Sequence, residues 1–81
     1  MKYERTFNFK RGYKKLPAEA QKAFEKQVVF LLSDIRHPSL RAKKYDESSD
    51  VWQARVTRNV RFYFRIEGDV YVLLSIRKHA D

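Results

Sequence analysis

The segment VWQARVTRNVRFYFR, residues Val51–Arg65, alternates apolar and polar side chains and holds four arginines within eleven positions. Alternation of this kind predicts β-strands, because successive side chains of a strand point to opposite faces. The pattern breaks at Arg58-Asn59, a pair that is typical of a turn. The segment therefore predicts two antiparallel strands, Val51–Thr57 and Val60–Ile66.

A third alternating run completes the predicted sheet. It spans Val70–Arg77 and follows Glu67-Gly68-Asp69, which is a strong turn signal. A three-residue loop there would place Arg61 opposite Ser75, and a three-residue loop between the first two strands would place Arg55 opposite Arg61. Like charges directly across a ladder destabilise it by a few tenths of a kcal/mol, so this pairing favours an anion between the guanidinium groups.

The two faces of the three strands differ in chemistry. One face is apolar and is expected to cover the helices: Trp52, Ala54, Val56, Val60, Phe62, Phe64, Ile66, Val70, Val72, Leu74 and Ile76. The other face is expected to carry Gln53, Arg55, Thr57, Arg61, Tyr63, Arg65, Tyr71, Leu73, Ser75 and Arg77, with no acidic residue. Phosphate fits the planar fork of arginine. A merely solvated arginine face is the simpler interpretation and stays open.

The N-terminal half predicts one strand and two helices. Lys2–Phe7 alternates, and Thr6 or Asn8 would cap a short helix that runs through Lys15. Apolar residues then recur at helical spacing from residue 17 to about residue 33, with a proline at the start, where a helix tolerates it.

The remaining segment, residues 35–50, has no clear period and predicts a loop, with a short strand near residues 40–44 left open. Together the elements predict one α+β domain over residues 1–81, a helical hairpin packed on a small antiparallel sheet.

Charge is the strongest signal in the composition. The sequence has 18 Lys+Arg against 10 Asp+Glu, which indicates a polyanionic partner such as nucleic acid, the ribosome or an acidic protein. Cysteine is absent, so the chain has neither disulfides nor a thiolate metal site. We see no membrane span, no signal peptide and no cofactor or metal motif. We therefore expect a cytoplasmic protein with no membrane partner, no cofactor and no metal.

Proton transfer near neutral pH requires a group that titrates there, and the sequence offers two histidines. His79 follows Arg77 by two positions and is expected to overhang the basic face, whereas His37 precedes a proline in a turn-like pair. Two fixed arginines and one histidine form a minimal set for RNA cleavage by the 2′-hydroxyl. An incidental surface role for each histidine stays open.

Four motifs occur in order along the chain: YKKLP at Tyr13–Pro17, RHPSL at Arg36–Leu40, VWQARVTRNVRF at Val51–Phe62 and KHAD at Lys78–Asp81. Together they resemble the RelE/ParE superfamily of bacterial type II toxin–antitoxin toxins, and the resemblance covers nearly the whole chain. It implies two helices on a small antiparallel sheet and an acidic, partly disordered antitoxin that neutralises the toxin. Many members cut mRNA in the ribosomal A site without a metal.

The resemblance also implies residue roles. Arg61 would clamp the scissile phosphate, Arg55 stands at a strand position that is often basic, and His79 would act as an acid or base. Gln53 stands where some of these nucleases have lysine, and Ala80 where aspartate is common. The residues expected to add affinity for RNA are Lys43, Lys44, Arg65, Arg77 and Tyr63.

The function predicted from the sequence is therefore a ribosome-dependent mRNA endonuclease toxin. Three alternatives stay open: a non-nuclease toxin that poisons DNA gyrase, an inactive homologue that only binds an antitoxin, and a general RNA-binding module that uses the arginine and tyrosine face.

Overall fold

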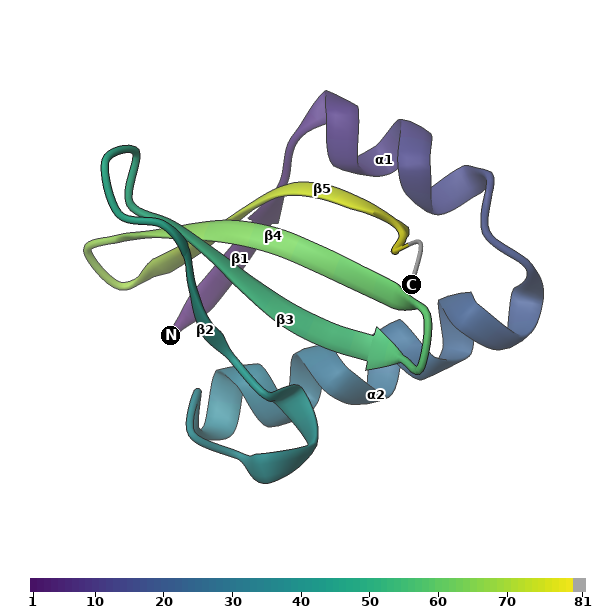
Figure 1. Cartoon of the computed structure of the whole chain (residues 1–81), viewed down its shortest axis with the longest axis horizontal. Helices are drawn as coiled ribbons and strands as arrows, with labels where there is room; N and C mark the ends of the chain where they lie inside the picture. The colour runs from purple at the N-terminus through teal and green to yellow at the C-terminus, as the bar shows by residue number, and fades with distance from the viewer. Residues whose placement is uncertain (80–81) are drawn as a thin grey trace.

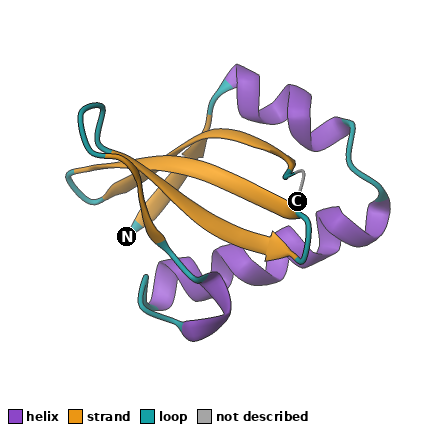
Figure 2. Ribbon diagram, viewed as in Figure 1, coloured by secondary structure: helices purple, strands orange, loops and turns teal. Residues whose placement is uncertain are grey.

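A computed structural model describes residues 1–79 and contains two α-helices and one five-stranded sheet (Figures 1 and 2). The elements are β1 (Lys2–Arg5), α1 (Phe7–Lys14), α2 (Ala18–Ser33), a 3-10 turn η1 (Pro38–Leu40), β2 (Lys43–Asp46), β3 (Val51–Thr57), β4 (Val60–Glu67) and β5 (Val70–Lys78). The strand order is β1-β5-β4-β3-β2. None of the helices in residues 1–79 is long and apolar enough to cross a membrane.

The predicted α+β fold is confirmed, with one difference in the sheet. β1 pairs parallel with β5, whereas the other three pairs are antiparallel, so the sheet is mixed. Parallel neighbours need a long connection between them, and here the helices and β2–β4 provide it. Figure 1 shows α1 beside β5 and α2 beneath β3, in agreement with their main contacts.

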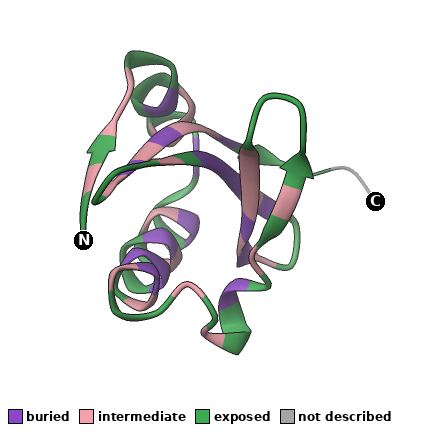
Figure 3. Ribbon diagram, turned by 90° about the vertical axis from the view of Figure 1, so that its left-hand side faces the viewer, coloured by how far each residue is buried: buried purple, intermediate pink, exposed green. Residues whose placement is uncertain are grey.

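One core joins the helices to the sheet. Its largest fully buried side chains are Phe9, Phe24, Phe62, Phe64, Leu31, Leu40 and Leu73. The Phe24 ring of α2 lies 5.2 Å from the Phe9 ring of α1 and 5.4 Å from the Phe62 ring of β4. In Figure 3 the buried positions gather where the helices face the strands, and the loops are exposed. The other face of the sheet has no helical cover and is free to carry polar groups.

The β4–β5 hairpin is tighter than the sequence predicted. Gly68 has a φ of 62°, the left-handed conformation that a two-residue hairpin turn favours, so the loop is Gly68-Asp69. Further along, Tyr63 pairs with Ser75 but its neighbour Phe64 pairs with Leu73, which leaves one residue of β5 without a partner. This unpaired residue forms a β-bulge. The side chains of β5 that precede the bulge therefore point to the opposite face from the one predicted.

This bulge overturns part of the predicted face assignment. Tyr71 and Leu73 expose only 5% and 0% of their surface in the core, so the prediction that they lie among the arginines is wrong. Val72 pairs with Arg65 instead. Arg61 pairs with Arg77 and not with the predicted serine. A period-2 pattern does not reveal a single inserted residue, because the segments on both sides of it still alternate.

Side chains at the start of α1 hold the bulge in place. The Thr6 hydroxyl caps the helix by accepting a hydrogen bond from the Phe9 N–H. The same hydroxyl donates towards the carbonyls of Leu73 and Leu74 at 2.9 and 3.1 Å, and the Asn8 amide donates to Leu74 at 3.2 Å. The carbonyl of the bulged residue is thus satisfied by α1, which ties the first helix to β5.

Candidate nucleic-acid interface

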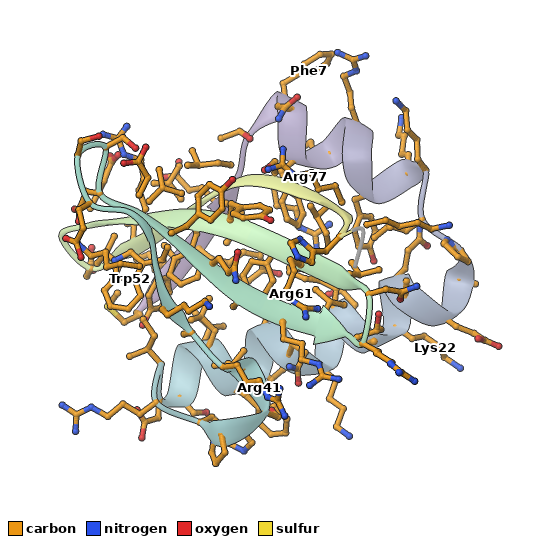
Figure 4. All side chains as sticks on the ribbon, in the orientation of Figure 1. Phe7, Lys22, Arg41, Trp52, Arg61 and Arg77 are labelled. Carbon is orange, nitrogen blue, oxygen red and sulfur yellow. The ribbon has the colours of Figure 1, made fainter. Side chains whose placement is uncertain are left out.

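Three arginines lie side by side on the uncovered face of the sheet, and we call them the arginine row. Arg55 of β3 pairs with Arg61 of β4, which pairs in turn with Arg77 of β5. Neighbouring strands are about 4.8 Å apart, so the row crosses about 10 Å of sheet. Figure 4 shows Arg61 and Arg77 on the same side of the sheet. Within residues 1–79, no member of the row forms an ion pair.

Two guanidinium groups of the row converge on the turn between β3 and β4. Arg55 Nε and an Arg61 terminal nitrogen donate to the same Thr57 carbonyl, at 3.3 and 2.8 Å. The same Arg61 nitrogen also lies 3.2 Å from the carbonyls of Arg58 and Val60. A guanidinium group has five N–H donors, so both side chains are positioned by the turn and keep donors for a ligand. The guanidinium groups of Arg55 and Arg61 thus lie close together on the open face of the sheet, as predicted.

The third arginine is positioned by aromatic rings. The Arg77 guanidinium carbon lies 4.5 Å from the centre of the Tyr63 ring, and the Tyr45 ring packs edge-on against Tyr63 at 4.9 Å. Tyr63 is only 4% exposed, so it supports Arg77 and does not offer a free ring for base stacking. Tyr45 is 56% exposed and lies beside the row. Sequence reasoning missed Tyr45 because the segment around it read as a loop.

The two predicted loop lysines lie on opposite faces of the sheet. Lys43 pairs with Gln53 on the face of the arginine row, but Lys44 pairs with Trp52 on the helix side. Lys44 lies over the Trp52 ring and forms an ion pair with Asp50, whose hydrogen bond raises the pKa of Lys44. Lys44 therefore points away from the arginine row, because neighbouring residues of a strand alternate faces. The contribution of both lysines to RNA affinity stays a prediction.

Arg65 shares the face of the row but lies apart from it. It is four residues beyond Arg61, about 13 Å along the strand, and is exposed without an ion pair to any residue of 1–79. Its partner Val72 pairs in turn with Glu4 of β1. The prediction of a face without acidic residues is wrong, because β4 extends to Glu67, on the side of Arg65, and β1 adds Glu4. Both acidic residues lie at the end of the face remote from the row.

His79 lies at the edge of the arginine row. Its backbone N–H donates to the Asn59 carbonyl at 2.7 Å, which extends the β4–β5 ladder to the β3–β4 turn. The imidazole is exposed, and by alternation it follows Arg77 on the same face. The backbone of His79 thus lies at the β3–β4 turn, and its part in proton transfer stays a prediction. The last two residues of the KHAD motif, Ala80 and Asp81, lie outside the described residues.

His37 is engaged in packing at η1. Its ring stacks on Phe30 with centroids 3.8 Å apart, and its Nδ1 accepts a hydrogen bond from the Ser39 N–H. Both contacts are structural. Across residues 1–79, no group of three or more histidine or acidic side chains is arranged to hold a metal ion.

No protein-family description and no curated protein matches the sequence. Solved structures match its shape. The YoeB/ParE toxin from Agrobacterium tumefaciens superposes with a TM-score of 0.79 over 99% of this chain and 100% of that chain, at 16% identity. The toxin–antitoxin complex RelBE2 from Mycobacterium tuberculosis gives 0.76 over 96% of each chain at 21% identity. The archaeal RelE–RelB complex from Pyrococcus horikoshii gives 0.80 over 98% and 94% of the two chains at 13% identity.

The chain has the RelE/YoeB/ParE toxin fold. The resemblance drawn from four short motifs is confirmed at the level of architecture. At these identities the RelE-type fold establishes the scaffold, and an activity has to be argued from the side chains that the scaffold presents.

Proposed function

We propose that this chain is the toxin of a type II toxin–antitoxin pair and that it cuts mRNA on the ribosome using side chains alone. The observation that carries the proposal is the arginine row. Three guanidinium groups that form no ion pair with any of residues 1–79 lie across adjacent strands of an uncovered face, and the His79 backbone is bonded to the β3–β4 turn. Their mutual repulsion costs stability, and a phosphodiester would reverse that cost by binding between them.

The chemistry that fits this arrangement is attack by the RNA 2′-oxygen on the adjoining phosphorus. The bond between phosphorus and the 5′-oxygen breaks, and the products are a 2′,3′-cyclic phosphate and a free 5′-hydroxyl. Arg55 and Arg61 stabilise the charge that develops on the non-bridging oxygens. His79 takes the proton from the 2′-hydroxyl or gives one to the leaving 5′-oxygen, since an imidazole ring can accept and donate a proton. Solvent water makes the other proton transfer.

The partner proposed for the basic face is an acidic, partly disordered antitoxin. The M. tuberculosis structure is a toxin–antitoxin complex, and the P. horikoshii structure is a RelE–RelB complex. This chain has a formal net charge of +8, which favours an acidic partner through long-range attraction. Such a partner would compete with RNA for the arginine row. Because mRNA is translated on ribosomes in the cytoplasm, the proposed activity is cytoplasmic.

The test is to add purified protein to a translating extract and map the RNA ends. We expect cuts within codons of translated mRNA, with 2′,3′-cyclic phosphate ends, and no cuts in the same RNA when initiation is blocked. Inhibition of DNA supercoiling without RNA cuts would establish a gyrase poison instead. RNA binding with neither cuts nor growth arrest would establish a binding module.

Replacing His79 with alanine is expected to slow single-turnover cleavage by about 10²-fold or more, since proton transfer contributes roughly 10²–10⁴-fold to such reactions. The pH–rate profile should also lose the limb that a proton-transferring side chain at position 79 contributes in the wild type. The matched control is His37→Asn, which keeps a hydrogen-bond acceptor at η1 and should retain both rate and profile. An unchanged pH profile in His79→Ala would remove His79 from the mechanism.

A further inference from the structure

A cavity of about 440 Å³ lies against β3, next to the arginine row. It is found where β2 stops covering the edge of β3, since their pairing ends at Gln53 while β3 continues to Thr57. The turn η1 and the residue that follows it form the opposite wall. It is a wide, open hollow on the protein surface, which suits an extended ligand more than an enclosed one.

The lining of this cavity is strongly cationic. Arg41, Arg55 and Arg58 all contribute to it, and no carboxylate does. None of the three arginines takes part in an ion pair within the described chain. Three like charges around one hollow repel each other unless an anion lies between them, so the charge pattern favours an anionic occupant.

The walls of the cavity are fixed by a buried amide. Gln27 of α2 is 6% exposed, and its Nε2 donates to the carbonyls of Ser39 and Arg55 at 3.0 and 2.8 Å. The Ser39 hydroxyl donates back to Gln27 Oε1 at 3.2 Å. These bonds fasten η1 to β3 and leave the Arg41 and Arg58 side chains exposed at the rim. The walls of the cavity are therefore held in place by hydrogen bonds within the fold.

Arg41 has an unusual backbone conformation. Its φ is 47° and its ψ is 42°, the left-handed region that non-glycine residues seldom adopt. Glycine or asparagine would fit this position with less strain. The end of η1 thus holds Arg41 in a conformation that costs energy, with its side chain at the rim of the cavity. Figure 4 shows Arg41 beside η1, with Arg61 on the sheet above it.

Arg55 belongs to both the cavity and the arginine row, and Thr57, whose carbonyl accepts hydrogen bonds from Arg55 and Arg61, also lines the cavity. The two features are therefore adjacent on the protein surface. We propose that the cavity holds the nucleotide adjoining the scissile phosphate, with Arg41 and Arg58 contacting its phosphate. Guanidinium groups suit this role because they bind phosphate through a fork and stack on bases. This inference rests on the proposed function and adds Arg41 and Arg58 to the RNA-binding residues.

The test measures binding separately from cleavage. A fluorescent RNA tetranucleotide with 2′-O-methyl groups throughout has no free 2′-hydroxyl, so anisotropy reports affinity alone. Arg41→Gly suits the left-handed backbone and should fold, and Arg58→Gln keeps a polar side chain. Each variant is expected to weaken binding at least fivefold at low salt and to lower the slope of log K against log salt by about 0.7. The control is Lys22→Gln, an exposed cation on α2 that does not line the cavity; Figure 4 shows it apart from Arg41.

Two results would overturn the inference. One is an unchanged salt slope in both arginine variants. The other is loss of affinity for an acidic poly-glutamate peptide without loss of affinity for the RNA, which would make the cavity a protein-binding site. If the proposed function is wrong, the result is different: the wild-type protein binds the oligonucleotide through Arg41 but cuts no translated mRNA.

Discussion

Replacing Arg61 with alanine is expected to abolish growth arrest and to lower the rate of mRNA cleavage by about 10²–10³-fold. Arg61 is the middle member of the arginine row, paired with Arg55 on one side and Arg77 on the other. Loss of one donor that stabilises a developing oxyanion costs about that factor in other enzymes. The measurements are growth after induction of the chain alone and single-turnover cleavage in a translating extract.

Folding must be separated from activity in this variant. Arg61 also donates to carbonyls of the β3–β4 turn, so alanine should lower the free energy of unfolding by about 1 kcal/mol. Thermal unfolding checks that the loss stays this small. Arg61→Lys keeps the positive charge without the planar fork and is expected to restore only part of the rate. The control Lys22→Ala, on the exposed side of α2, should stay fully toxic. Full toxicity of Arg61→Ala at equal expression would refute the catalytic role.

Replacing Gly12 with alanine is expected to lower the free energy of unfolding by about 2 kcal/mol. A Cβ at this position would overlap the Ile76 backbone carbonyl oxygen, because α1 lies directly on β5 there. Alanine favours a helix over glycine by about 1 kcal/mol, and overpacking costs roughly 1–3 kcal/mol. We expect a cost at the upper end of that range, about 3 kcal/mol, since a strand carbonyl cannot rotate away as a side chain can. The net loss is then about 2 kcal/mol. The melting temperature should fall by about 8–16 °C.

The control for Gly12→Ala is Lys14→Ala in the same helix. Lys14 is exposed, so its replacement should change stability by less than about 0.5 kcal/mol. Equal or higher stability of Gly12→Ala would show that α1 moves away from β5 without cost. Because Thr6 and Asn8 hold the β5 bulge from α1, displacement of the helix should also disturb Arg77 and reduce cleavage.

The candidate site was only partly predictable. The sequence predicts that Arg55 and Arg61 are opposite partners, and the structure has this pairing. The predicted turn between β3 and β4 has three residues, whereas the turn in the structure has two and β3 has a bulge after Arg55. The shorter turn and the bulge shift the register in opposite directions, so the pairing of the two arginines is unchanged. The sequence also predicts that His79 lies near the arginine row, because it follows Arg77 by two positions. The burial of Tyr63, the orientation of Lys44 and the part played by Tyr45 were not predicted, because each depends on how β2 packs beside β3.

The class of the fold, the strands β3 and β4, and the separation of an apolar face from an arginine face can be predicted from the sequence alone. These features follow from local periodicity, since a strand presents alternate side chains to opposite sides whatever surrounds it. The register of β5 depends on tertiary contacts, because its bulge is stabilised by Thr6 and Asn8, more than sixty positions away. The cavity beside β3 also depends on tertiary contacts, because it requires Gln27 of α2 to bridge η1 and the strand. Hydrogen bonds between segments that are distant in the sequence produce no periodic pattern, so they are found only in the folded structure.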